Sequence, residues 1–118
     1  MNNKIYHLSS CSTCVKILGC LTDKSGIELI NIKEKNITPE DLDYAAKMLG
    51  SYEQLFSRRA LKFRSMGLHE KVLTEKDYRK LILGEYTFLK RPVSFINGKV
   101  FAGNTKDSVE ALKQAVNG

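Results

Sequence analysis

The sequence predicts an α/β fold in which helices flank a four-stranded mixed sheet, with a helical insertion in the middle of the chain at about residues 38–84. Short runs of strand-forming residues lie near both ends of the chain, and segments with helical spacing follow them. The middle holds helix-start and helix-stop signals but no strand pattern. A chain of 118 residues is expected to form a single domain, residues 1–118.

The first third of the chain predicts a strand, a helix and a second strand. The stretch KIYHL (4–8) alternates and is rich in strand formers. A helix is expected to start near Ser12 and to end before Gly26. Its buried face is predicted from apolar residues at helical spacing, namely Cys14, Leu18 and Leu21. The second strand is predicted at 27–32.

Two well-marked helices are predicted in the middle, at 38–50 and 74–83. Each starts with a threonine that has an aspartate three residues later, and each is expected to end at a glycine. These residues are Thr38, Asp41 and Gly50 in the first helix, and Thr74, Asp77 and Gly84 in the second. Residues 52–66 look helical but irregular.

The last third predicts a β-hairpin followed by a helix. PVSFI (92–96) and KVFAG (99–103) flank the dipeptide NG at 97–98, which is a strong hairpin signal. The final helix is expected to begin near Asn104 or Thr105. The resulting order, β-α-β, then helices, then β-β-α, is the pattern of a thioredoxin-like fold with helices inserted in the middle.

The charge of the chain is unevenly distributed. The net charge is +6, and residues 58–91 carry the whole excess, with ten Lys or Arg against four acids. This suggests an anionic ligand or an acidic or nucleic-acid partner, and a solvated basic face remains the alternative. Without a base-reading motif, sequence-specific nucleic-acid binding is not expected. With neither a long apolar run nor an apolar signal core, we expect a cytoplasmic protein that does not bind membranes.

The stretch SSCSTCVK (9–16) is the strongest chemical signal. Cys11 stands at the turn from the first strand into the first helix, where unpaired N–H groups and the helix dipole favour a thiolate. Ser10, Ser12 and Thr13 are small residues that would let backbone amides approach an oxyanion. Cys14 lies one turn further on and could resolve a bond formed at Cys11. The alternative role of Cys14 is that of a small buried apolar residue.

Other roles for the cysteines are less well supported. A structural zinc site needs four ligands, commonly two pairs of cysteine or histidine, and this chain has one C-x-x-C. No metal is therefore expected. Cys20 is expected to lie in the core, although a redox role is open. Three clustered cysteines do not make a secreted disulfide framework.

At this point the chain resembles the glutaredoxin-dependent arsenate reductase family and the related Spx regulators. YHLSSCSTCVK, LFSRRALKFRSMGL (55–68) and LKRPVSF (89–95) carry the resemblance, which spans essentially the whole chain. It implies a thiol-based oxidoreductase in which Cys11 attacks an oxyanion or a glutathione mixed disulfide. Arg59 and Arg91 would bind the anion, with Arg58 as the rival of Arg59. Pro92 would be cis and lie against the cysteine loop. The resemblance implies no bound cofactor, and glutathione and glutaredoxin as external reductants.

Two departures favour a thiol–disulfide function. Family arsenate reductases carry a third arginine where this chain reads FAGNTKD, and they usually have serine at the position of Cys14. The alternative is therefore an Spx-like redox-sensing transcriptional regulator. Such a protein would use a Cys11–Cys14 disulfide switch and would bind the C-terminal domain of the RNA polymerase α subunit. Gly50 is the nearest match to the Spx glycine that contacts polymerase, but a helix cap already accounts for it.

Overall fold

The computed structural model describes residues 2–118, which form two compact units. The sheet unit comprises the chain up to Lys35 together with Arg91–Gly118. The helical unit comprises Asn36–Lys90. The helical insertion that the sequence predicts at about 38–84 is therefore present, and each unit is described separately below.

The sheet unit contains the predicted four-stranded mixed sheet. Its strands are β1 (Lys4–His7), β2 (Glu28–Asn31), β3 (Val93–Ile96) and β4 (Lys99–Ala102), in the spatial order β2-β1-β3-β4. β1 pairs with β2 in parallel and with β3 in antiparallel, and β3 pairs with β4 in antiparallel. The hairpin turn is at Asn97 and Gly98, whose φ angles of 52° and 82° are both left-handed. This is the geometry that the NG dipeptide predicts.

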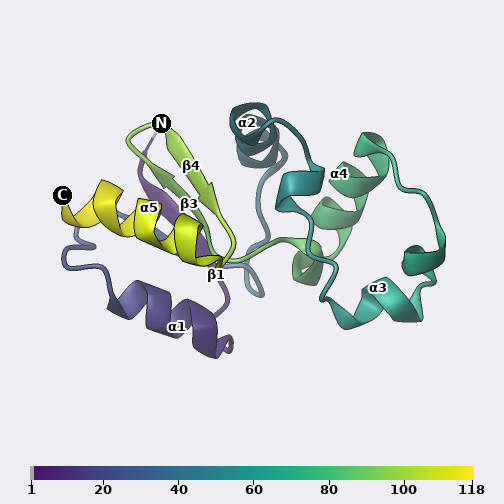
Figure 1. Ribbon diagram of the computed structural model, residues 1–118, viewed down its shortest axis with the longest axis horizontal. Coiled ribbons are helices and arrows are strands. Elements are labelled where there is room, and N and C mark those ends of the chain that lie inside the picture. Colours follow the sequence, from purple (N-terminus) through teal and green to yellow (C-terminus); the bar gives the residue numbers. More distant parts are fainter. Residues whose placement is uncertain (1) are drawn as a thin grey trace. The chain divides into compact units, whose positions relative to one another are not determined.

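Two helices, α1 (Ser12–Gly19) and α5 (Lys106–Asn117), pack on the same face of this sheet. Figure 1 shows them side by side against the strands. Their shared core contains the buried side chains of Ile5, Ile17, Leu21, Ile96 and Leu112. Ile17, rather than the predicted Leu18, supplies the buried apolar residue in the middle of α1, and Leu18 packs at the edge of the cluster.

The helical unit contains three α-helices and three short 3-10 helices. They are α2 (Pro39–Leu49), η1 (Glu53–Leu55), α3 (Leu61–Ser65), η2 (Leu68–Glu70), α4 (Glu75–Gly84) and η3 (Tyr86–Phe88). The region 52–66 is thus irregular, as its sequence predicts.

The helix caps of this unit follow the local sequence closely. The Thr38 hydroxyl accepts a hydrogen bond from the Asp41 N–H, and Gly50 ends α2 with a φ of 103°. Thr74 and Asp77 form a reciprocal capping box at the start of α4. One boundary differs, because Gly84 is the last residue of α4 and Glu85 is the C-cap. The helix therefore ends without a glycine in the left-handed conformation, because the backbone becomes extended at Glu85.

An aromatic cluster forms part of the core of the helical unit. The Phe56 ring stacks on Phe88 at a centroid distance of 5.2 Å and lies 4.9 Å from the Tyr78 ring. Phe63 meets the Phe56 ring edge-on at 5.9 Å. A backbone bridge between Phe56 and Leu89 brings the two ends of this segment together. These contacts fix the position of Phe56 and therefore of the segment that follows it, which contains Arg58 and Arg59.

Candidate functional site

The candidate site is the turn between β1 and α1, with Cys11 as the N-cap residue of α1. The Cys11 N–H donates to the Leu8 carbonyl at 3.0 Å, which closes the turn. The Ser9 hydroxyl accepts from the Asn31 side-chain amide at 2.9 Å, which ties the turn to the end of β2. Cys11 is partly exposed. The thiol is thus fixed at the start of a helix, where the first-turn N–H groups are unpaired.

The surroundings of Cys11 favour its thiolate. Partial burial alone would raise the pKa of Cys11, but the backbone N–H and the thiol of Cys14 act in the opposite direction. The Thr13 N–H and the Arg91 side chain add to their effect, so the pKa of Cys11 lies below its usual value. The Cys11 side chain makes no capping hydrogen bond of standard geometry. The nearby N–H groups nevertheless stabilise a negative charge on the sulfur more than they stabilise the neutral thiol.

Cys14 has the opposite character. It is fully buried, and burial is the main reason why its pKa rises to about 11. A hydrogen bond with the Leu8 backbone lowers it, the negative charge and the hydrogen bond of the neighbouring Cys11 raise it, and the charge of Arg91 has a smaller lowering effect. At neutral pH, Cys14 is therefore a protonated thiol beside Cys11. This position is compatible with both roles that the sequence suggested for Cys14, namely a small buried residue and a resolving thiol.

Arg91 lies beside Cys11 within the sheet unit. The Arg91 side chain interacts with Cys11, and the Arg91–Pro92 peptide bond is cis, as the resemblance implied. The Pro92 carbonyl accepts a hydrogen bond of 2.9 Å from the Gly103 N–H. Gly103 has a φ of 85°, a conformation that disfavours arginine at this position. The left-handed backbone at Gly103 therefore occurs in the segment where the sequence lacks the third arginine of the arsenate reductases that it resembles.

Arg58 and Arg59 belong to the helical unit and differ sharply in their bonding. The Arg58 guanidinium donates to the Glu53 carboxylate at 2.7 Å and to the Tyr78 hydroxyl at 2.9 Å. It also lies 5.7 Å from the centre of the Tyr78 ring. Within residues 2–118, the Arg59 side chain takes part in no hydrogen bond or ion pair. The Arg58 guanidinium is thus bonded to side chains of its own unit, whereas the Arg59 guanidinium is available to bind a ligand.

The remaining predicted residues are placed as follows. Ser10, Ser12 and Thr13 are exposed around the start of α1. Cys20 is exposed, so the expectation that it lies in the core is wrong. Cys20 follows the last residue of α1 and lies six positions after Cys14, which turns it about 120° away from Cys14 around the helix axis. None of the His, Cys, Asp or Glu side chains of residues 2–118 gather in a group that could hold a metal ion.

The sequence analysis did not single out Ser94 on β3. Its hydroxyl is fully buried and has no hydrogen-bond partner among the described residues. Its only sequence signal is a polar residue inside an otherwise apolar strand. Separately, none of the helices formed by residues 2–118 has both the length and the apolar character needed to cross a bilayer.

The two pKa shifts predict different alkylation rates. At pH 7, we expect iodoacetamide to modify Cys11 at least about tenfold faster than Cys14, because only the thiolate reacts. The rate at Cys11 should fall about tenfold per pH unit once the pH drops below its lowered pKa. The comparison uses Cys11→Ser and Cys14→Ser in a Cys20→Ser background, since the exposed Cys20 would otherwise react. Equal rates in the two proteins would contradict the assigned roles.

The sheet and its helices place the chain among proteins of thioredoxin-like fold, with a partly exposed cysteine at the start of α1. A family model described as the ArsC family matches residues 6–112. The chain therefore belongs to the ArsC family, as the resemblance in its sequence indicated. No curated protein matches the chain at a significant level.

Solved structures share this fold over nearly the whole chain. An arsenate reductase from Vibrio cholerae is 18% identical with a TM-score of 0.77, covering 98% of this chain and 98% of that one. An arsenate reductase (ArsC) related protein from Brucella melitensis is 27% identical with a TM-score of 0.68, covering 94% and 93%. A protein named YFFB is 23% identical with a TM-score of 0.80, covering 97% and 98%. The thioredoxin-like, mixed-sheet fold predicted from the sequence is thereby confirmed.

Proposed function

We propose that the protein is a thiol-based oxyanion reductase of the arsenate reductase type, with arsenate as the candidate substrate. The observation that carries the proposal is the environment of Cys11, where helix N–H groups and Arg91 lower the pKa of a partly exposed thiol. The direct test is arsenate-dependent NADPH oxidation in an assay coupled through glutathione, glutaredoxin and glutathione reductase.

The proposed chemistry begins at Cys11. Its thiolate attacks arsenate, an oxygen leaves as water, and a sulfur–arsenic bond forms. A second thiol, either Cys14 or glutathione, then attacks the Cys11 sulfur. A disulfide forms and the arsenic leaves as arsenite, having gained the two electrons that the two thiols lost. Glutathione and glutaredoxin return the disulfide to thiols.

The pKa values support an order for the two thiols. While Cys11 is a thiolate, its charge and its hydrogen bond raise the pKa of Cys14 and keep Cys14 protonated. Once Cys11 has formed a covalent bond, both of these contributions disappear. The Cys14 thiol then ionises more readily, at the stage when it is needed as a nucleophile. Cys14 is therefore our first choice for the resolving thiol.

The anion would be held by Arg91 and Arg59. A thiolate that attacks an oxyanion brings two negative charges together, and planar guanidinium groups offset the repulsion and orient the anion. Arg91 already interacts with Cys11. Arg59 is chosen over Arg58 because Glu53 and Tyr78 occupy the Arg58 guanidinium.

Oxyanion binding tests these assignments. We expect Arg59→Ala and Arg91→Ala to weaken arsenate binding by about tenfold to a hundredfold each, since each removes a charge-assisted contact. Arg58→Ala, the matched control, should change the affinity less than about threefold. Calorimetric titration of arsenate into the Cys11→Ser protein measures binding without turnover. If Arg58→Ala weakens binding as much as Arg59→Ala does, the choice between these neighbours is wrong.

A Cys11–Cys14 disulfide switch of the Spx type is the second candidate. The hydrogen-bonding contact between the two thiols favours it, because the same pair could form a disulfide without any oxyanion. In this case the partner would be the C-terminal domain of the RNA polymerase α subunit. Binding that depends on the oxidation of Cys11 and Cys14, in a protein without arsenate turnover, would support this candidate instead.

A further inference from the structure

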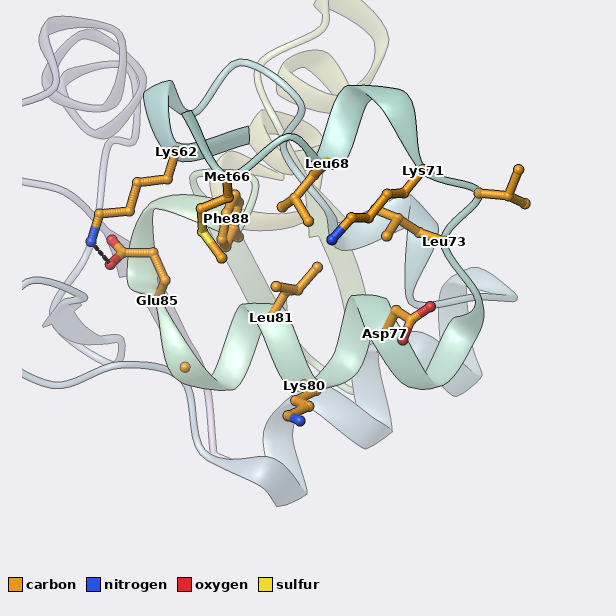
Figure 2. A pocket seen from close by; sticks show the side chains of 12 residues that line it. Lys62, Met66, Leu68, Lys71, Leu73, Asp77, Lys80, Leu81, Glu85 and Phe88 are labelled. Atoms are coloured by element: carbon orange, nitrogen blue, oxygen red, sulfur yellow. Dashed lines mark hydrogen bonds and ion pairs between the residues drawn. The ribbon is translucent and has the colours of Figure 1, made fainter. Parts of the chain in front are cut away.

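The helical unit contains a pocket that the thiol chemistry does not use. It has a volume of about 640 Å³ and lies between the α3–η2 segment and α4. Apolar side chains supply much of its lining, namely Met66, Leu68, Leu73, Leu81 and Phe88. Figure 2 shows these side chains converging from both sides of the pocket. Its volume is in the range of sites that bind small organic ligands.

Of the three lysines that line the pocket, only Lys62 forms an ion pair among residues 2–118, which leaves Lys71 and Lys80. Lys62 forms an ion pair with Glu85 at 2.6 Å. The Asp77 carboxylate accepts from the Thr74 N–H and hydroxyl in the capping box. The Lys71 ammonium makes no hydrogen bond or ion pair with residues 2–118, although its charge helps to lower the pKa of Asp77.

The direction of the lysine side chains supports a role for Lys71. In Figure 2 the Lys71 side chain extends back towards Leu68 and Leu81, whereas the Lys80 side chain lies on the opposite side of the α4 ribbon. One uncommitted ammonium therefore stands beside an apolar lining.

The pocket is also open to ligands from solvent. The Met66 side chain, which lines it, is 49% exposed, and the neighbouring Val72 is 97% exposed. Exposed apolar groups of this kind are stabilised when an apolar ligand covers them. A ligand that satisfied both features would combine an apolar body with a single negative charge.

From this geometry we infer that the pocket binds an amphipathic monoanion, a small organic carboxylate with an apolar chain or ring. The carboxylate pairs with the Lys71 ammonium, and the apolar body lies over Met66 and Leu81. This inference concerns a site separate from the Cys11 thiol and does not depend on the oxyanion chemistry.

Decanoate, below the concentration at which it forms micelles, is the probe for this site. Titration of isotope-labelled protein should shift the amide signals of Lys71, Met66 and Leu81. We expect Lys71→Gln to weaken decanoate binding about tenfold, the loss of one charge-assisted contact. The matched control Lys76→Gln removes a charge from α4 outside the pocket and should leave the affinity unchanged. Decanol, which lacks the charge, should bind wild-type and Lys71→Gln protein equally.

A second pair of variants tests the apolar part. Met66→Glu places a carboxylate at the pocket and should abolish decanoate binding. Met48→Glu is the matched control, because Met48 lies on α2 outside the pocket and is also 49% exposed. The inference fails if decanoate does not bind, if the shifts fall outside the pocket, or if each control loses as much affinity as its partner. Decanol binding as tightly as decanoate would also overturn it, since the charge would then have no role.

Discussion

Replacing Cys11 with serine is expected to lower arsenate-dependent turnover by at least about a thousandfold. The serine hydroxyl stays protonated near neutral pH, so the N–H groups of α1 and the Arg91 side chain no longer have a thiolate to stabilise. The rate is measured as NADPH oxidation in the glutathione- and glutaredoxin-coupled assay. Cys20→Ser is the matched control, since Cys20 is exposed at the other end of α1 and should retain nearly full activity.

Two results would change the proposal. Turnover that survives in Cys11→Ser would show that another group is the nucleophile. An inactive wild-type protein whose thiols are free and titratable would rule out arsenate reduction under these conditions. The disulfide switch would then become the leading candidate, and the partner to test would be the C-terminal domain of the polymerase α subunit.

Replacing Phe56 with alanine is expected to lower the free energy of unfolding of the helical unit by about 3–5 kcal/mol. Phe56 is 1% exposed and touches Phe88, Tyr78 and Phe63, so its removal leaves a cavity in the middle of the aromatic cluster. Urea unfolding followed by far-UV circular dichroism measures the loss. Each transition is fitted separately if the two units unfold independently.

Phe63→Ala is the matched control for this prediction. Phe63 is only partly buried and meets the Phe56 ring at the edge of the cluster. Its removal should cost about 1–2 kcal/mol, because solvent can fill part of the space. Equal losses in the two variants would show that the cluster is not centred on Phe56.

Local sequence was enough to predict many of the elements. The caps at Thr38 and Thr74 and the left-handed turn at Asn97–Gly98 depend on residues within three or four positions of one another. Cys11 at the start of α1 was predictable for the same reason. A strand, a short polar turn and a helical pattern determine its place without any distant contact.

The parts that could not be predicted depend on contacts between distant segments. The choice of Ile17 over Leu18 as a buried residue follows from how α1 meets Ile96 and Leu112. Arg58 differs from Arg59 because its guanidinium donates a hydrogen bond to Tyr78, which lies twenty positions further along the chain. The left-handed Gly103, which bonds to Pro92, is visible only when both segments are folded.

The groups that set the acidity of the Cys11 thiol are confined to one of the two units. The groups named above that shift the pKa of Cys11, in Cys14, Thr13 and Arg91, all belong to the sheet unit. The helical unit enters as one continuous insertion, Asn36–Lys90, between two segments of the sheet unit. Substitutions within this insertion therefore leave the groups that lower the pKa of Cys11 in place. The inserted segment is thus a part of the chain that relatives can vary while they keep the same acidic cysteine.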